Sequence, residues 1–397
     1  MTPRAPSTPM ELRADENELA FQLPERLFSP TGSAEAGAPL LLKCIDCHAG
    51  GEPARVVLAG VPAFPMECNT ALRKRAHMMD HMDGLRRVLL LEPRGYPCQN
   101  VDFIFAPTPG GSGNLQYVIG EQNKIYPLMS GHNTICAATA VLECGVVPME
   151  EPVTRFTMDA PAGPIEITAE CCAGKAVTIA LKNTPSFVEH LGIEVNVPHG
   201  IGKVTLDVAY GGMWYAVVDL RQFEASSLDM TLDTSNAAEL CRVGEMIKVA
   251  CREQFPVQHP TEDYPGVDIL VFRGDATPGS GAHSRNTVVM SNTVLDWDKP
   301  GTWTGMLDRS PCGTGTCAVM AVMHARGELK VGEPFVHESI VGSQFTGTIL
   351  EETVLEGDGR VAIIPEIKGS ACITQYSMVV VDPSDPFPEG YQVSDIW

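Results

Sequence analysis

The strongest constraint on the fold is a sequence pattern that occurs twice. Ser-Gly-His-Asn at 130–133 precedes an apolar helical run that stops at Gly145, and Cys-Gly-Thr-Gly at 312–315 precedes a similar run that stops at Gly327. In both copies a threonine follows at the same place, and the closing glycine lies at the same distance from the leading residue. Apolar residues at helical spacing, closed by glycine, are typical of a helix. We therefore predict two similar α/β halves, each with a buried helix entered through a glycine-rich turn.

Other segments extend this pattern. HAGGEPARVVL at 48–58 and AYGGMWYAVVDL at 209–220 both place Gly-Gly before a Val-Val run. Short β-branched or apolar runs between turn residues predict strands, and they lie at 54–58, 156–158, 165–169, 203–208, 215–220, 268–272 and 377–381. The clearest helical periodicity lies at 134–144, 237–253 and 316–326. The fold class is thus α/β, and more specifically α+β, because strands dominate and helices are few.

Charge and composition exclude several classes of protein. The 397 residues are enough for two domains of ordinary size, and the formal net charge is −21. An acidic excess without a basic cluster repels phosphate backbones and anionic membranes, so nucleic acid is not an expected partner. No apolar run approaches the roughly 20 residues of a membrane span, and the first residues do not resemble an export signal. We expect a cytoplasmic protein whose 13 cysteines are reduced thiols.

The two helix starts also carry chemistry. The first turn of a helix exposes unpaired N–H groups and a partial positive charge, which suit a carboxylate. The same field is expected to lower the pKa of a cysteine at that place, so that Cys312 could act as a thiolate base. If the two helix starts face each other, Ser130 and Cys312 flank one small carboxylate substrate. Such a site suits reactions at the α-carbon, because it surrounds the developing enolate with donors.

The two motifs also have a family resemblance. DRSPCGTGT at 308–316, together with MSGHNTI at 129–135, resembles the paired signatures of the proline racemase family. That family also includes hydroxyproline 2-epimerases and trans-3-hydroxy-L-proline dehydratases. Further similar segments run from about Lys43 to the C-terminus, and they are HAGGEPARVV, LEPRG, DVAYGG, VGSQFTG and PEGYQVSDIW.

The resemblance implies the two-domain fold of diaminopimelate epimerase, in which two pseudo-symmetric domains each wrap a mainly antiparallel sheet around a central helix. We expect the first domain at 40–200, completed by 365–397, and the second at 201–364. Residues 1–39, rich in Pro, Ala, Ser and Glu, are predicted to be a mobile extension. The resemblance also implies an active site between the domains, no pyridoxal phosphate or metal, and a homodimer.

The resemblance assigns roles by position. Cys312 matches the second catalytic cysteine of the family, and Ser130 stands where racemases have the first. The resemblance implies that backbone groups at four positions hold the substrate carboxylate and that an aspartate receives the ring nitrogen; these residues are Gly131, His132, Gly313, Thr314 and Asp308.

Ser130 decides between reactions. Racemisation by two thiols needs a thiolate and a thiol on opposite faces of the α-carbon, and a serine hydroxyl is a far poorer acid. Elimination of a 3-hydroxyl needs one base only. The leading hypothesis is therefore dehydration of trans-3-hydroxy-L-proline to Δ1-pyrroline-2-carboxylate. The alternative is a 4-hydroxyproline 2-epimerase or proline racemase, and a third is a non-catalytic amino-acid-binding protein.

Other cysteine patterns are set aside. CIDCH at 44–48 matches haem c attachment or a redox dithiol, but haem attachment would require export. Cys171 and Cys172 are adjacent and would point to opposite faces of a strand, which disfavours a zinc site. Three more cysteines lie within the predicted helices and are expected to be core residues; they are Cys136, Cys144 and Cys317.

Overall fold

The computed structural model describes residues 39–111, 113–355 and 357–393. The predicted extension at 1–39 lies outside these residues, except for its last position. The strands are β1 Leu40–Ala49, β2 Glu52–Ala59, β3 Asn100–Phe105, β4 Leu115–Gly120, β5 Val153–Ala160, β6 Gly163–Cys172, β7 Lys175–Lys182, β8 Ser186–Val197, β9 Gly202–Tyr210, β10 Trp214–Asp219, β11 Ile269–Gly274, β12 Ser284–Met290, β13 Met306–Leu307, β14 Pro334–Glu338, β15 Gln344–Val354, β16 Val361–Gly369 and β17 Ala371–Val381. The α-helices are α1 Ala71–His81, α2 Asp83–Leu90, α3 Gly131–Glu143, α4 Ala237–Gln254 and α5 Gly313–Ala325.

The chain runs through the same topology twice. In the first half, β2 pairs parallel with β3, β3 pairs antiparallel with β4, and β4 pairs parallel with β5. In the second half, β10, β11, β12 and β14 repeat these three pairings in the same order and with the same directions. Helix α3 follows β4, as α5 follows β12 and β13. The fold is therefore α+β with two pseudo-symmetric halves, as the repeated helix-start pattern predicts.

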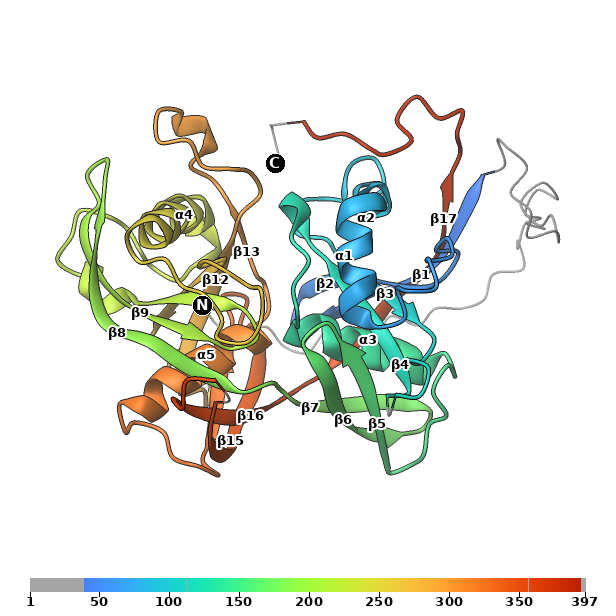
Figure 1. Cartoon of the computed structure of the whole chain (residues 1–397). Helices are drawn as coiled ribbons and strands as arrows, with labels where there is room; N and C mark the ends of the chain where they lie inside the picture. The colour runs from blue at the N-terminus through green and yellow to red at the C-terminus, as the bar shows by residue number, and fades with distance from the viewer. Residues whose placement is uncertain (1–38, 112, 356, 394–397) are drawn as a thin grey trace.

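Strand β8 lies before the predicted division but pairs with strands of the second half, and β17 returns to the first strand of the chain. Strand β8 pairs with β9 and β16, and β17 pairs with β1. The end of β16 also pairs with β7, so each ladder closes around one helix. Figure 1 shows the two units side by side, with α3 inside one and α5 inside the other. The predicted division at residue 200 stays a prediction, and the pairing of β8 favours a position nearer residue 185.

Both central helices are buried on all sides. In α3, every residue from Gly131 to Leu142 is buried, and in α5 every residue from Gly313 to Val322. A helix that is buried on all faces belongs inside a core. Small residues in both helices let the surrounding strands approach, and the largest hydrophobic cluster of the described residues includes side chains from both helices.

Most predicted elements are present. The predicted helices at 134–144, 237–253 and 316–326 correspond to α3, α4 and α5, and all seven predicted strands overlap observed ones. Helices α3 and α5 begin three residues earlier than predicted, directly after the leading Ser and Cys. Helix α1 was not predicted because its sequence, ALRKRAHMMDH, is mostly polar and only three of its residues are buried. None of the described helices is long and apolar enough to cross a membrane.

Candidate active site

The two helix starts touch at the boundary between the halves. A methyl group placed on Gly131 would lie 2.5 Å from the Cα of Gly313, and one placed on Gly313 would lie 2.6 Å from the Cα of Gly131. Only glycine at both positions permits this approach. The first-turn N–H groups of α3 and α5, which have no partner within a helix, therefore come together at one place.

Cys312 is the N-cap of α5 and is 6% exposed. Its sulfur accepts a hydrogen bond from the backbone N–H of Gly315 at 3.3 Å and lies 3.3 Å from the Tyr215 hydroxyl. Its own N–H donates to the Ser310 hydroxyl at 3.0 Å. Both the sulfur and the backbone of this residue are thus held in place.

The expected direction of the Cys312 pKa is wrong for this structure. Burial raises the pKa of the thiol well above its usual range, and the Asp308 carboxylate raises it further. Hydrogen bonds from Tyr215 and Gly315 act in the opposite direction but do not outweigh burial. The helix start supplies a donor, as expected, but the sequence does not show how completely the folded chain removes water from the sulfur.

Ser130 is the N-cap of α3 and is 5% exposed. Its hydroxyl makes no capping hydrogen bond to the helix backbone, unlike most N-cap serines. Instead, the Asn133 side-chain amide donates to Oγ at 3.1 Å, and His132 Nδ1 lies 3.4 Å from Oγ. The hydroxyl therefore stays available at the boundary between the halves.

A hydrogen-bond network behind His132 joins the two halves. The Asn100 side-chain amide contacts His132 Nε2 at 3.2 Å and donates to Glu52 Oε1 at 3.3 Å. Glu52 Oε2 accepts from the backbone N–H of Arg309 at 2.7 Å. An amide nitrogen can only donate, so a neutral His132 ring that accepts from Asn100 at Nε2 carries its proton on Nδ1, facing Ser130. Burial lowers the pKa of His132, which favours this neutral ring.

Asp308 lies directly before this Glu52 contact. It is 2% exposed, and its Oδ1 accepts from the backbone N–H of Ser310 at 2.7 Å. The turn-capping role that competes with substrate binding is thus present in the structure. The charge of Asp308 also raises the pKa values of Cys312 and Glu52.

Several acidic side chains are buried near the boundary. Burial raises the pKa of Glu52 well above its usual range and the pKa of Glu121 to about 8, and Asp308 raises both further. Burial likewise raises the pKa of Asp102 well above its usual range. Neither carboxyl oxygen of Asp102 has a hydrogen-bond partner among the described residues. This region therefore favours neutral carboxyl groups or an added positive charge.

The site is closed in this structure. A small cavity of about 10 Å³ reaches Asn100 and Glu121, and it shares Pro97, Cys98 and Met306 with an outer cavity of about 740 Å³. The outer cavity lies between the halves and has an apolar lining with two arginines, Arg242 and Arg309.

The structure brings together the site residues expected from the sequence and adds three others. Ser130, Gly131, His132, Cys312, Gly313, Thr314 and Asp308 all lie at the meeting point of the two helix starts. Sequence reasoning missed Asn100, Glu52 and Tyr215. Glu52 and Tyr215 lie in the two Gly-Gly segments, where the repeat could have directed attention, whereas nothing in the sequence distinguished Asn100.

The cysteines that were set aside lie away from this site. Cys44 and Cys47 are both buried on β1 but pack into different hydrophobic clusters, which does not fit a dithiol. Cys136 and Cys317 are fully buried, and their predicted core role is confirmed. Cys144 is only half-buried, because it caps the C-terminus of α3.

The structure has two pseudo-symmetric halves, and the central helix starts of the two halves meet at their boundary. This arrangement defines the class of the diaminopimelate epimerase-like fold. Residues 44–392 match the profile of the family described as proline racemase. The chain therefore belongs to the proline racemase family, whose members are enzymes.

Similar proteins cover nearly the whole chain. A 4-hydroxyproline 2-epimerase of Rhizobium etli is 36% identical over 357 residues, which are 90% of this chain and 96% of the relative. A proline racemase of Clostridioides difficile is 36% identical over 361 residues, 88% of this chain and 97% of the relative.

Solved structures give the same family. A hydroxyproline epimerase from Agrobacterium vitis, with bound trans-4-hydroxy-L-proline, superposes with a TM-score of 0.79 at 33% identity, covering 90% of this chain and 96% of that one. A probable proline racemase from Agrobacterium radiobacter K84, with bound carbonate, gives 0.78 at 36% identity, covering 90% and 98%.

Proposed function

We propose that this chain is an isomerase that inverts the α-carbon of 4-hydroxyproline or proline, and we favour 2-epimerisation of 4-hydroxyproline. The observation that carries the proposal is the contact between the two helix starts, whose N-cap residues are Ser130 and Cys312. It supports a mechanism in which these two side chains flank one substrate carboxylate. The names of the similar epimerases and racemase support the isomerase over the dehydratase that the serine had favoured.

The substrate carboxylate would lie between the first turns of α3 and α5. The N–H groups of Gly131, His132, Gly313 and Thr314 are available to it, because N–H groups of a first turn have no helical partner. Asp308 would receive the ring nitrogen as a cation. That positive charge offsets the buried carboxyl groups nearby and favours the Cys312 thiolate, which burial alone disfavours.

Inversion then takes two proton transfers at the α-carbon. The Cys312 thiolate takes the α-proton, and the electron pair passes into the carboxylate as enolate charge held by the helix N–H groups. A proton returns to the opposite face from the Ser130 hydroxyl. Two donors, the Asn133 amide and His132 Nδ1–H, face Ser130 Oγ at 3.1 and 3.4 Å and stabilise negative charge on this oxygen. They make the serine a better acid than its residue type suggests.

Dehydration of trans-3-hydroxy-L-proline is the second candidate, and the serine itself is the observation that favours it. An enolate that is slowly reprotonated from the Ser130 side has time to expel a 3-hydroxyl. The hydroxyl leaves as water with the proton that Cys312 took from the α-carbon, and the resulting enamine tautomerises to Δ1-pyrroline-2-carboxylate.

The test is a panel of substrates incubated with the purified chain in D₂O. From trans-4-hydroxy-L-proline we expect cis-4-hydroxy-D-proline with deuterium at the α-carbon, detected by NMR and chiral chromatography. Pyrroline formation from trans-3-hydroxy-L-proline, followed with o-aminobenzaldehyde, without any epimer would instead establish the dehydratase. If the chain binds these substrates but none of them gains deuterium at the α-carbon, the non-catalytic amino-acid-binding protein would be the remaining hypothesis.

Three expectations from the sequence remain predictions. We expect the active chain to need no cofactor, to be cytoplasmic and to form a homodimer. Activity after exhaustive chelation, cell fractionation and light scattering test them in turn.

A further inference from the structure

We propose that Tyr215 is a positioning residue that holds the Cys312 side chain in its reactive place and donates a hydrogen bond to the sulfur when it is a thiolate. This inference rests on the proposed role of Cys312 as the base. It adds a group from a different part of the chain, 97 positions away in sequence, to the machinery that controls the thiol.

Tyr215 is in direct contact with the reactive end of α5. Its hydroxyl lies 3.3 Å from Cys312 Sγ and 2.6 Å from Thr314 Oγ1. A methyl group placed on Gly315 would lie 3.1 Å from the Cys312 sulfur and 3.3 Å from Tyr215 Cε1. The tyrosine ring, the sulfur and the first turn of the helix therefore form one close-packed unit, in which the absence of a side chain at Gly315 leaves room for the ring.

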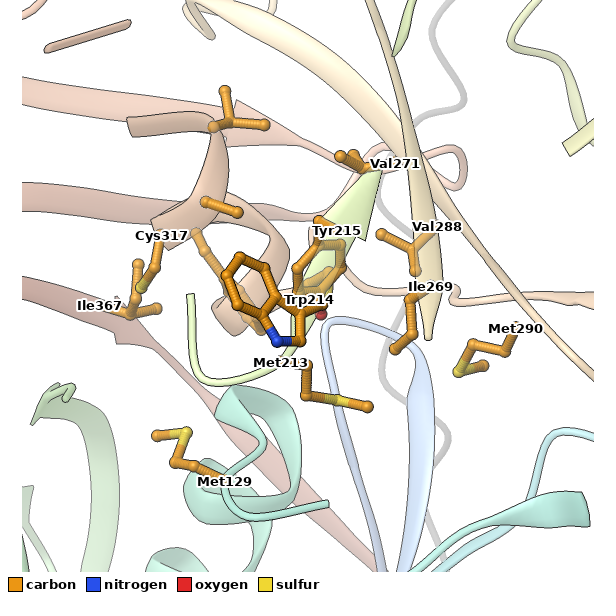
Figure 2. Close-up of a cluster of buried hydrophobic side chains, with 14 of the residues drawn as sticks. Met129, Met213, Trp214, Tyr215, Ile269, Val271, Val288, Met290, Cys317 and Ile367 are labelled. Carbon is orange, nitrogen blue, oxygen red and sulfur yellow. Dashed lines mark hydrogen bonds between the residues drawn. The ribbon is translucent and has the colours of Figure 1, made fainter. Parts of the chain in front are cut away.

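The strand beneath the ring fixes its position. Tyr215 lies on β10, where it pairs with Ala209 of β9 and Ile269 of β11. Its side chain is fully buried, and Figure 2 shows its ring within the apolar cluster that contains Ile269, Val271 and Val288. The hydroxyl cannot turn to solvent and has two recorded partners, the sulfur and Thr314.

The direction of the hydrogen bonds at Tyr215 follows from the number of protons on each hydroxyl. A tyrosine hydroxyl has one proton, so it donates to only one of its two partners. When Cys312 is a thiolate, the sulfur is the stronger acceptor, and the Thr314 hydroxyl can donate to the tyrosine oxygen. The chain then runs from Thr314 to Tyr215 to the sulfur, and the Gly315 N–H adds a second donor at 3.3 Å.

The charges around the sulfur show why such a donor matters. Burial and the Asp308 carboxylate both raise the pKa of Cys312, whereas the hydrogen bonds from Tyr215 and Gly315 lower it. Across the boundary, burial lowers the pKa of His132, which disfavours a positive charge on this ring. A hydrogen bond from the Tyr215 hydroxyl therefore favours the Cys312 thiolate without adding a positive charge beside it.

The other half supplies a matched control. Tyr117 is also fully buried, and its hydroxyl lies 2.7 Å from Thr134 Oγ1. Thr134 in turn donates to the Ser130 carbonyl rather than to its hydroxyl. Removing the Tyr117 hydroxyl thus deletes a similar buried contact, but one that reaches Ser130 only through Thr134.

The experiment compares Tyr215→Phe with Tyr117→Phe in the full chain. The rate of iodoacetamide labelling of Cys312, followed by peptide mass spectrometry as a function of pH, reports the thiolate fraction. For Tyr215→Phe we expect the labelling midpoint to rise by about one pH unit, kcat to fall roughly 10- to 100-fold and KM to change less than about threefold. Tyr117→Phe should keep the wild-type midpoint.

The labelling separates this inference from the proposed function. A wild-type midpoint in Tyr215→Phe would overturn the role of Tyr215, even if turnover fell. Full turnover in Cys312→Ala would instead overturn the base, whatever the labelling showed. If Tyr215→Phe does not fold, Thr314→Val provides a second readout, because it removes the hydroxyl that donates to Tyr215 and should raise the midpoint in the same direction.

Discussion

The backbone at Cys312 is strained. The residue has φ 55° and ψ 110°, a region that residues other than glycine rarely adopt. The surrounding hydrogen bonds maintain this conformation, since the carbonyl of the preceding Pro311 accepts from Asn286 at 3.0 Å and from Thr316 at 3.0 Å. Such backbone strain persists where the surrounding contacts hold the conformation in place. Here it directs the sulfur back over its own helix start.

Loss of the sulfur should remove activity without unfolding the chain. We expect Cys312→Ser to lower kcat on the order of 10³-fold, because a hydroxyl is not deprotonated near neutral pH. Its melting temperature should stay within a few degrees of wild type, and substrate should still bind by calorimetry. Turnover above a tenth of wild type would contradict the thiolate mechanism.

Replacing Ser130 by cysteine should favour inversion. The change supplies a second thiol on the far face of the α-carbon, and we expect Ser130→Cys to raise L-proline racemisation on the order of 10²-fold. Any pyrroline formation from trans-3-hydroxy-L-proline should fall in the same variant, because faster reprotonation shortens the life of the enolate. Polarimetry and the o-aminobenzaldehyde assay measure the two reactions. An unchanged ratio of the two would show that Ser130 does not deliver the proton.

At the scale of elements, the site depends on how closely α3 and α5 approach. Their starts come from opposite halves, and the close contact is between the backbones of Gly131 and Gly313. Backbone cannot move aside as the end of a flexible side chain can. The distance between the two helix starts is therefore set by the absence of two side chains.

A methyl group at this contact should separate the helices. We expect Gly131→Ala to destabilise the fold by about 1–3 kcal/mol and to raise KM, because the two turns can no longer hold one carboxylate together. Gly301→Ala is the control, since a methyl group there meets nothing within 4 Å. Denaturant unfolding and initial-rate kinetics measure both effects. A Gly131→Ala variant with wild-type KM would contradict the shared carboxylate site.

The strand pairings that join the two halves also affect the spacing of the helix starts. Because β17 pairs with β1 and the end of β16 pairs with β7, strands from the end of the chain complete the sheet of the first half. These pairings tie one half to the other. This connection supports a fixed spacing between two helix starts that belong to different sheets.

At the scale of the whole molecule, the buried carboxyl groups make stability depend on pH. Burial raises the pKa of Glu121 from 4.5 to about 8. A carboxyl whose pKa is raised on folding stabilises the folded chain fully below its unfolded value, and this contribution is lost as pH rises through the folded value. The loss attributable to Glu121 therefore falls between about pH 4.5 and pH 8.

Glu121→Gln should remove this dependence. The amide resembles the protonated carboxyl, so we expect the variant to be more stable than wild type at pH 8.5, relative to pH 5, by on the order of 2–4 kcal/mol. Urea unfolding at both pH values measures the difference. The exposed Glu224→Gln variant should show no such gain, and an equal response in both variants would contradict the assignment.

The sequence by itself determined the local features of this protein. A leading Ser or Cys, a first turn of small residues, an apolar run and a closing glycine are signals within one helix, and both helices lie where this pattern predicted them. The repeat of that pattern also indicated two similar halves. Helix α1 was missed because its few buried residues leave little apolar periodicity.

Only the tertiary structure decided which distant residues meet. The pairing of β17 with β1, the contact of Tyr215 with Cys312 and the bond from Arg309 to Glu52 join residues far apart in sequence. The direction of the Cys312 pKa belongs to the same group, because desolvation depends on every neighbour that excludes water. Local sequence therefore specified the donor at the helix start, whereas burial by the assembled halves determined how strongly the thiol holds its proton.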